Sequence, residues 1–248
     1  MHNGTEISEQ VADALQVTGS VKQLRTIHAE SPESALATLR ARGWSLLPLA
    51  PEHDLRSIIP LLRPRLAHHE ASFQVELVSP KTSDRARPGT MSALYGMGSF
   101  PLHTERAHWP TPPRFLILRS VGDASDRPTT LLDSYRFALD QKLTQELLQT
   151  PWIVRWDEVS FQSRVLLPSS SGKGRWHVRY DPSCMVPCDE ARRGLAERLE
   201  QALASLEPEQ HYWESGIVLL IDNWRVLHGR GQSPDPDFGR ALERVVVP

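Results

Sequence analysis

The stretch VLLIDNWRVLHGR, residues 218–230, contains two short apolar runs separated by the polar pair Asp222 and Asn223. Short runs rich in Val, Ile and Leu that are bounded by turn-forming residues are typical of β-strands. The Asp-Asn pair favours a turn, and we expect that turn to fold the second strand back on the first. The second run ends near His228, whose imidazole would be costly to bury without a hydrogen bond or a metal ion. The stretch therefore predicts two strands and a histidine that needs a partner.

Segments of the same kind occur along most of the chain. They are short, rich in Val, Ile, Leu and aromatic residues, and bounded by Pro, Gly, Asp or Ser. They cover residues 114–121, 129–135, 152–161, 163–168, 175–181, 216–222, 224–230 and 243–248. About eight short strands predict a β-sandwich or a β-barrel.

Two helices are predicted beside these strands. Residues 31–43 have Ser31 as an N-cap, Pro32 at the first helical position and Gly43 just after the end, and residues 44–50 follow as a further strand. Residues 189–206 place leucines and alanines at spacings of three and four on one face. The fold class is therefore α+β, mainly β, with helices flanking a β core.

Composition limits the classes of function. With 248 residues the chain is long enough for one large core, and we expect a single domain over residues 1–248, with residues 1–20 as a mobile or peripheral arm. The formal net charge of -2 gives no broad basic surface for nucleic acid. We see no leader-like segment and no apolar run of about 18 residues, so we expect a cytoplasmic protein without a membrane partner.

The segment FPLHTE, residues 100–105, places a histidine and a glutamate two positions apart. In a strand, His103 and Glu105 would project from the same face and offer a nitrogen and an oxygen ligand side by side. Pro101 and the prolines after Trp109 argue against a long continuous strand, which suits a site at a strand end near a barrel mouth. Such a pair is a weak signal alone, because chance produces it often. His228 supplies a third ligand, and two histidines with one carboxylate form the facial triad of non-haem Fe(II) oxygenases.

The C-terminal segment offers groups that could bind an anion. Arg240 and Arg244 are four residues apart, and Arg240 could form two hydrogen bonds with a carboxylate. Thr130 could donate its hydroxyl to the same anion. Taken singly, each of these residues is more often an ordinary surface or strand residue.

Taken together, these motifs resemble a known superfamily. HTE, then TTLLD with its second threonine 27 residues after the histidine, then IDNWRVLHGR, then two arginines four residues apart, occur in that order. This order is similar to the Fe(II)/2-oxoglutarate-dependent oxygenases of the taurine dioxygenase and clavaminate synthase-like superfamily. The similarity extends over residues 92–248 and includes PPRFLILRS and VRYDPSCMVPCDEARRGL. The HxE form of the motif and the DNxRxxHGR stretch resemble the clavaminate synthase branch.

The resemblance implies a double-stranded β-helix, a cupin-like jelly roll. It implies Fe(II) bound by His103, Glu105 and His228, and 2-oxoglutarate whose distal carboxylate is held by Thr130 and Arg240. Arg244 would help to hold the cosubstrate or an acidic group of the substrate. With O2, such enzymes convert 2-oxoglutarate to succinate and CO2 and most often hydroxylate an unactivated carbon.

The resemblance leaves the substrate open, and we expect a small polar molecule such as an amino acid derivative or an intermediate of specialised metabolism. The segment MSALYGMGSF, residues 91–100, is the expected substrate-facing wall, with Tyr95 and Ser99 as donors. Two other classes fit the same residues: a zinc-dependent hydrolase or isomerase on a cupin-like barrel, and a non-catalytic member of the fold.

Overall fold

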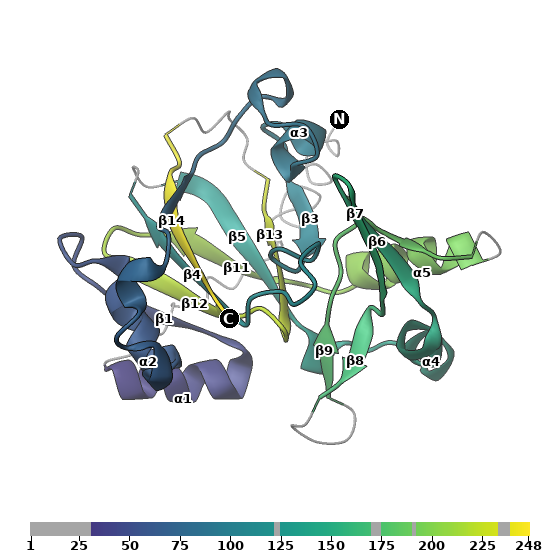
Figure 1. Ribbon diagram of the computed structural model, residues 1–248, viewed down its shortest axis with the longest axis horizontal. Coiled ribbons are helices and arrows are strands. Elements are labelled where there is room, and N and C mark those ends of the chain that lie inside the picture. The colour runs from purple at the N-terminus through teal and green to yellow at the C-terminus, as the bar shows by residue number, and fades with distance from the viewer. Residues whose placement is uncertain (1–30, 122–124, 170–174, 190–191, 233–238) are drawn as a thin grey trace, which may run out of the picture.

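The computed structural model describes residues 31–121, 125–169, 175–189, 192–232 and 239–248, and two antiparallel sheets form its centre (Figure 1). Among these residues the larger sheet has the strand order β1 (Trp44–Pro48), β12 (Ile217–Asp222), β4 (Phe115–Ser120), β14 (Leu242–Val247) and β2 (Glu76–Val78). The second sheet has the order β11 (Glu209–Trp213), β5 (Ser125–Asp133), β13 (Val226–Arg230) and β3 (Phe100–His103). Strands β2 to β5, and again β11 to β14, thus alternate between these two sheets along the chain, as in the predicted jelly-roll architecture.

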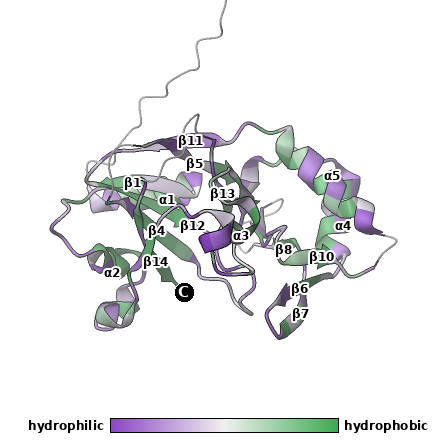
Figure 2. Ribbon diagram, turned by 90° about the horizontal axis from the view of Figure 1, so that it is seen from above, coloured by the Kyte–Doolittle hydropathy of each residue, from purple (hydrophilic) through white to green (hydrophobic). Residues whose placement is uncertain are grey.

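The space between the two sheets is filled by every second residue of each strand. In β12, Leu219 and Ile221 point into this inner core, whereas Val218 and Leu220 point to the outer face of the larger sheet. The second sheet contributes Leu131 of β5 to the same inner core, together with Trp213 and Val226. Because successive side chains of a strand face opposite ways, strands that are buried on both faces are largely apolar. Figure 2 shows β4, β12 and β14 as mostly apolar.

The outer face of the larger sheet is covered by the N-terminal helices. Helix α1 (Pro32–Arg42) begins with a capping box formed by Ser31 and Ser34, and it ends at Gly43, whose φ of 81° is left-handed. Helix α2 (Ile59–Leu62) and the short 3-10 helix Leu55–Ile58 complete this layer. The predicted first helix is therefore confirmed to the residue, since its signals are all local.

A second layer packs beside the other sheet, on the opposite side of the molecule (Figure 1). It contains α4 (Gln141–Gln149), α5 (Arg193–Ala204), the sheet β10 (Met185–Pro187), β6 (Trp152–Trp156) and β7 (Val159–Ser163), and the pair β8 (Leu166–Pro168) and β9 (Trp176–Val178). Helix α3 (Met91–Tyr95) precedes β3, and further 3-10 turns span Pro64–Leu66, Glu70–Ser72, Ser83–Arg85 and Ser134–Arg136.

Two details differ from the sequence prediction. Asp222 and Asn223 do not close a hairpin, because β12 and β13 belong to different sheets and the pair crosses from one sheet to the other. The predicted strand 152–161 is two strands joined at Asp157, which has a φ of 53°. The predicted arm 1–20 lies outside the described residues. Among the described residues, none of the helices combines the length and the apolar character that a membrane span requires.

Candidate metal centre

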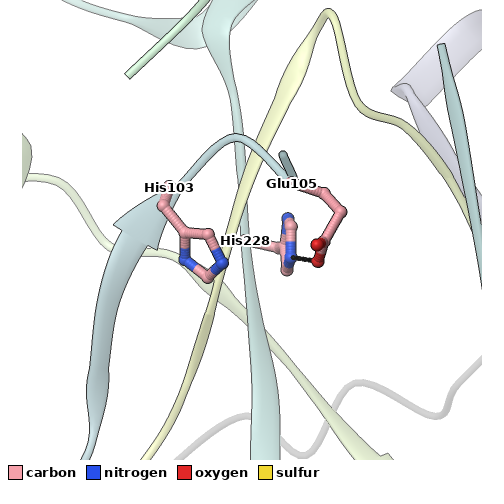
Figure 3. Close-up of side chains that lie close together, drawn as sticks. All are labelled: His103, Glu105 and His228. Atoms are coloured by element: carbon pink, nitrogen blue, oxygen red, sulfur yellow. Dashed lines mark ion pairs between the residues drawn. The ribbon is translucent and has the colours of Figure 1, made fainter. Parts of the chain in front are cut away.

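His103 and His228 lie opposite each other at the end of the second sheet. Strands β3 and β13 are antiparallel neighbours, and the two residues are direct register partners. Both side chains are buried, and their ring centroids are 4.4 Å apart (Figure 3). His228 shares its strand face with Val226 of the inner core, so the histidine pair lies at the mouth of the space between the sheets.

Glu105 reaches this pair from a turn and not from the strand. Strand β3 ends at His103, and residues 105–108 form a turn. The buried side chain of Asn223 holds this turn: its Oδ1 accepts from the backbone N–H of Glu105 at 2.7 Å, and its Nδ2 donates to the backbone oxygen of Glu105 at 3.1 Å. His103 and Glu105 lie at a strand end, as expected, whereas the expectation that the strand pleat aligns Glu105 with His103 is wrong.

The three side chains converge as predicted. Ligand atoms of His103, Glu105 and His228 all lie within 4.8 Å of one another, and Oε2 of Glu105 is 3.6 Å from Nε2 of His228 (Figure 3). Nδ1 of His103 is 2.9 Å from the backbone oxygen of Pro101, which leaves Nε2 of that ring facing the centre. These residues could therefore hold a divalent metal ion.

The electrostatics of the centre suit a cation. Burial alone would raise the pKa of Glu105, but the charge of Arg244 and the neighbouring imidazole of His228 outweigh it and lower that pKa. Burial, with a smaller contribution from His103, lowers the pKa of His228 to about 4. The site thus presents one ionised carboxylate and a neutral His228 imidazole near pH 7, which are the forms that bind metals.

Arg240 lies on the inner face, in the wall of the same cavity, and its partner is Thr129. Nη2 of Arg240 donates to Oγ1 of Thr129 at 3.2 Å, and both side chains are buried. Thr130, the residue predicted for this role, faces the other way in β5, with its hydroxyl against Gly229. Since side chains alternate along a strand and Leu131 belongs to the inner core, Thr129 shares that face and Thr130 does not.

Arg244 is bound to the carboxylate of the centre. Its Nη1 donates to Oε1 of Glu105 at 3.1 Å, and its Nε donates to Oε2 of Glu76 at 2.9 Å. Burial disfavours the charged guanidinium, but Glu105 and Glu76 outweigh that effect and raise the pKa of Arg244. Arg244 is therefore at the predicted centre, with an acidic partner that the sequence did not indicate.

A cavity of about 360 Å³ opens over the centre. His103, Glu105, His228, Arg240, Arg244 and Thr129 all line it. Its wall also contains Asp181, a buried carboxylate, and the stacked rings of His108 and Trp156, whose centroids are 4.2 Å apart. Of the predicted substrate-facing segment, Met91, Ser92 and Phe100 line the cavity, whereas Tyr95 and Ser99 are not among its lining residues.

Four residues at the centre or in the cavity wall were not predicted from the sequence as site residues: Thr129, Asp181, Glu76 and Trp156. Asp181 follows a strand in RWHVRYD, and a carboxylate at a strand end was the one available signal. Glu76 and Trp156 belong to ordinary strand segments, so no local pattern distinguishes them.

No protein-family model matches the chain, and no curated protein matches it by sequence. Solved structures share its fold. An asparagine oxygenase in complex with Fe(II), 2S,3S-3-hydroxyasparagine and succinate matches with a TM-score of 0.63 at 16% identity, over 87% of this chain and 78% of that chain. The non-heme iron oxygenase OrfP with Fe and alpha-ketoglutaric acid matches with a TM-score of 0.60 at 21% identity, over 87% and 77%. The PvcB protein from Pseudomonas aeruginosa matches with a TM-score of 0.63 at 18% identity, over 90% and 82%. The fold that the sequence resemblance implied is thereby confirmed.

Proposed function

We propose that the protein is an Fe(II)- and 2-oxoglutarate-dependent dioxygenase that hydroxylates an unactivated carbon of a small amino acid or amino acid derivative. The observation that carries the proposal is the convergence of the metal triad with a buried arginine and threonine on one cavity. Two of the structures with this fold are iron oxygenases, one in complex with Fe(II) and succinate and the other with Fe and alpha-ketoglutaric acid, and they support the same assignment.

The triad residues have separate tasks. His103, Glu105 and His228 would hold the ion beside the cavity. When bound, Fe(II) with 2-oxoglutarate and O2 supplies the oxidising power for hydroxylation, with succinate and CO2 as products. The chain itself supplies the three ligands, among them an ionised Glu105 and a neutral His228, and the cavity groups that would orient the two organic molecules.

Thr129 and Arg240 provide a place for the distal carboxylate of 2-oxoglutarate. Oγ1 of Thr129 accepts from Nη2 of Arg240 and from Nε1 of Trp213, each at 3.2 Å. A hydroxyl has two acceptor positions and one hydrogen, so with both positions used its hydrogen is left for a third group. A carboxylate beside Arg240 would accept that hydrogen and pair with the guanidinium.

A neighbouring arginine also favours an anion here. Burial, together with the charges of Arg127 and Arg240, lowers the pKa of Arg230 to about 9. Arg230 donates to the backbone oxygens of Gly96 and Gly98. A dicarboxylate held by Arg240 would reduce the mutual repulsion of these guanidiniums. Its binding is therefore favoured by this electrostatic effect as well as by hydrogen bonds.

The opposite charges of the cavity wall support an amino acid as the substrate. The carboxylate of Asp181 is buried at the wall, oriented by hydrogen bonds to its Oδ1 from the backbone N–H and hydroxyl of Ser183 at 2.8 and 2.6 Å. It could bind an ammonium group. The remaining N–H groups of Arg244 could bind a carboxylate, and a cavity of about 360 Å³ fits a small molecule. Related folds carry hydroxylated asparagine and arginine in their complexes.

The metal and cosubstrate assignment can be tested without knowing the substrate. Metal-free protein is mixed anaerobically with Fe(II) and 2-oxoglutarate, and we expect the weak visible charge-transfer band of their chelate. The variants His228→Ala and Arg240→Gln should lose or weaken this band, and Thr130→Val should keep it. Tight zinc binding with no band would favour the hydrolase alternative, and no metal binding at all would favour a non-catalytic protein.

The substrate class is tested by coupled turnover. Amino acids and their derivatives are screened for succinate formation above the uncoupled rate, with mass spectrometry for a gain of one oxygen. For a substrate found in this way, Asp181→Asn should raise KM strongly while leaving the anaerobic chelate band unchanged. If Asp181→Asn leaves KM unchanged, Asp181 does not bind the substrate amine.

A further inference from the structure

Two guanidinium groups flank one oxygen of Glu105. Nη1 of Arg244 donates to Oε1 at 3.1 Å, and Nε of Arg106 lies 3.6 Å from the same oxygen. The other oxygen, Oε2, faces His228 at 3.6 Å. The two oxygens of one carboxylate therefore have different partners: Oε1 lies beside two arginines, and Oε2 faces His228.

Glu76 binds both of these arginines. Its carboxylate accepts from Nη2 of Arg106 at 2.7 and 3.0 Å, and from Nε and Nη2 of Arg244, the first at 2.9 Å. Glu76 lies in β2 and is the direct register partner of Arg244 in β14, so the pairing is built into the sheet. Arg106 reaches it from the turn after Glu105, where its φ of 55° is uncommon for a residue other than glycine.

These four side chains form a charge-balanced group of two arginines and two glutamates. Glu76 is about one-quarter exposed and Glu105 about one-tenth, with side-chain values of 28% and 10%. Without Glu76, two guanidiniums would face the single carboxylate of Glu105. The Nε and Nη2 edge of Arg244, now occupied by Glu76, would then be available to Glu105, and a guanidinium can bind both oxygens of a carboxylate at once.

We propose that Glu76 is a positioning residue for the metal centre: by holding Arg244 and Arg106, it restricts them to Oε1 of Glu105 and keeps Oε2 available as the metal ligand. The inference rests on the metal centre of the proposed function and not on the identity of the cosubstrate or substrate. A partner of this kind acts on metal affinity through the ligand that it orients, and removing one typically weakens binding by about 10- to 100-fold.

The test measures binding of Co(II) alone, with no cosubstrate, by the visible absorption of the bound ion. We expect Glu76→Gln to weaken Co(II) binding by about 10- to 100-fold, and Glu76→Asp, which keeps the charge, to weaken it less. The matched control is Glu243→Gln. Glu243 precedes Arg244 in β14 and pairs with Arg119 at 2.6 Å, away from the triad, so its variant removes the same kind of ion pair without touching the centre.

A double variant separates charge balance from general damage. Glu76→Gln with Arg106→Gln returns the group to one arginine and one glutamate, and we expect it to recover part of the lost Co(II) affinity. The inference is overturned if Glu76→Gln binds Co(II) as tightly as the wild type. It is also overturned if Glu76→Gln and Glu243→Gln lose the same Co(II) affinity and the same thermal stability, because general destabilisation would then explain both losses. If the wild type itself binds no Co(II), the metal centre of the proposed function is refuted, which is a different result.

Discussion

The two adjacent threonines of β5 give the sharpest test of the proposed site, because they lie on opposite faces of the strand. Thr129 is buried on the inner face beside Arg240, whereas Thr130 lies on the other face of the strand. Valine has nearly the shape of threonine but no hydroxyl. We therefore expect Thr129→Val to weaken binding of 2-oxoglutarate and Thr130→Val to leave it unchanged.

The size of the effect follows from the hydrogen bond that is lost. Thr129 would donate to a charged carboxylate, and a hydrogen bond to a charged group contributes about 1.5–3 kcal/mol. Since about 1.4 kcal/mol corresponds to a tenfold change in an equilibrium constant, the dissociation constant should rise about 10- to 150-fold. The assay is an anaerobic titration of 2-oxoglutarate into the Fe(II)-loaded protein, followed by the charge-transfer band.

Stability has to be measured in parallel, since Thr129→Val also removes the acceptor of the buried Trp213 Nε1. Leaving that donor without a partner should cost about 1–3 kcal/mol of unfolding free energy. Thr129→Ser keeps the hydroxyl and should keep most of the affinity. The reasoning is refuted if Thr130→Val weakens binding as much as Thr129→Val does, or if Thr129→Val binds 2-oxoglutarate like the wild type.

Three further predictions concern the rest of the molecule. Asp133→Ala should lower the free energy of unfolding by about 3–5 kcal/mol in chemical denaturation, because it leaves the buried guanidinium of Arg225 without its bidentate partner; a loss below 1 kcal/mol would contradict this. Burial, together with the charge of Arg106, lowers the pKa of His108, so below its ordinary value of about 6.5 the unfolded chain binds more protons than the folded one. Stability should therefore be fully present above that pH and fall as the pH is lowered, and the fall should be smaller in His108→Asn. Burial and the nearby Asp181 raise the pKa of the Cys184 thiol, whereas Cys188 is exposed, so iodoacetamide at pH 8 should label one thiol in the folded protein and two after denaturation.

The fold was predictable where its signals are local. Helix α1 begins and ends at the residues that Ser31, Pro32 and Gly43 indicate, because capping depends on neighbours a few positions away. Most strands were predicted as apolar runs for the same reason, whereas β2, β10 and β11 were not predicted. Their pairing was not predictable, because an apolar run buried on both faces gives no sign of which strand lies beside it.

Register limits the prediction of the site in the same way. In PTTLLD both threonines favour a strand and both leucines are apolar, so alternation cannot tell which threonine faces the inner core. A shift of one residue turns every side chain to the other face. The choice between Thr129 and Thr130 is made by the partners of β5 on each side, which are distant in the sequence. The candidate metal triad did not depend on register, because metal binding restricts the residue types strongly.

The position of Glu105 depends on Asp222 and Asn223, the pair that was wrongly predicted to form a hairpin turn. Asp222 and Asn223 have the composition of a hairpin turn, yet they connect the two sheets. A tight hairpin would have kept Asn223 at the edge of one sheet. In the crossing segment its side chain is fully buried and binds both the N–H and the carbonyl oxygen of Glu105, a residue 118 positions earlier. A primary amide can donate and accept at once, so the Asn223 side chain satisfies both backbone groups of Glu105. By fixing this backbone, it also orients the Glu105 carboxylate. His228 is in the strand that begins just after this crossing, so one connection between the sheets positions two of the three candidate ligands.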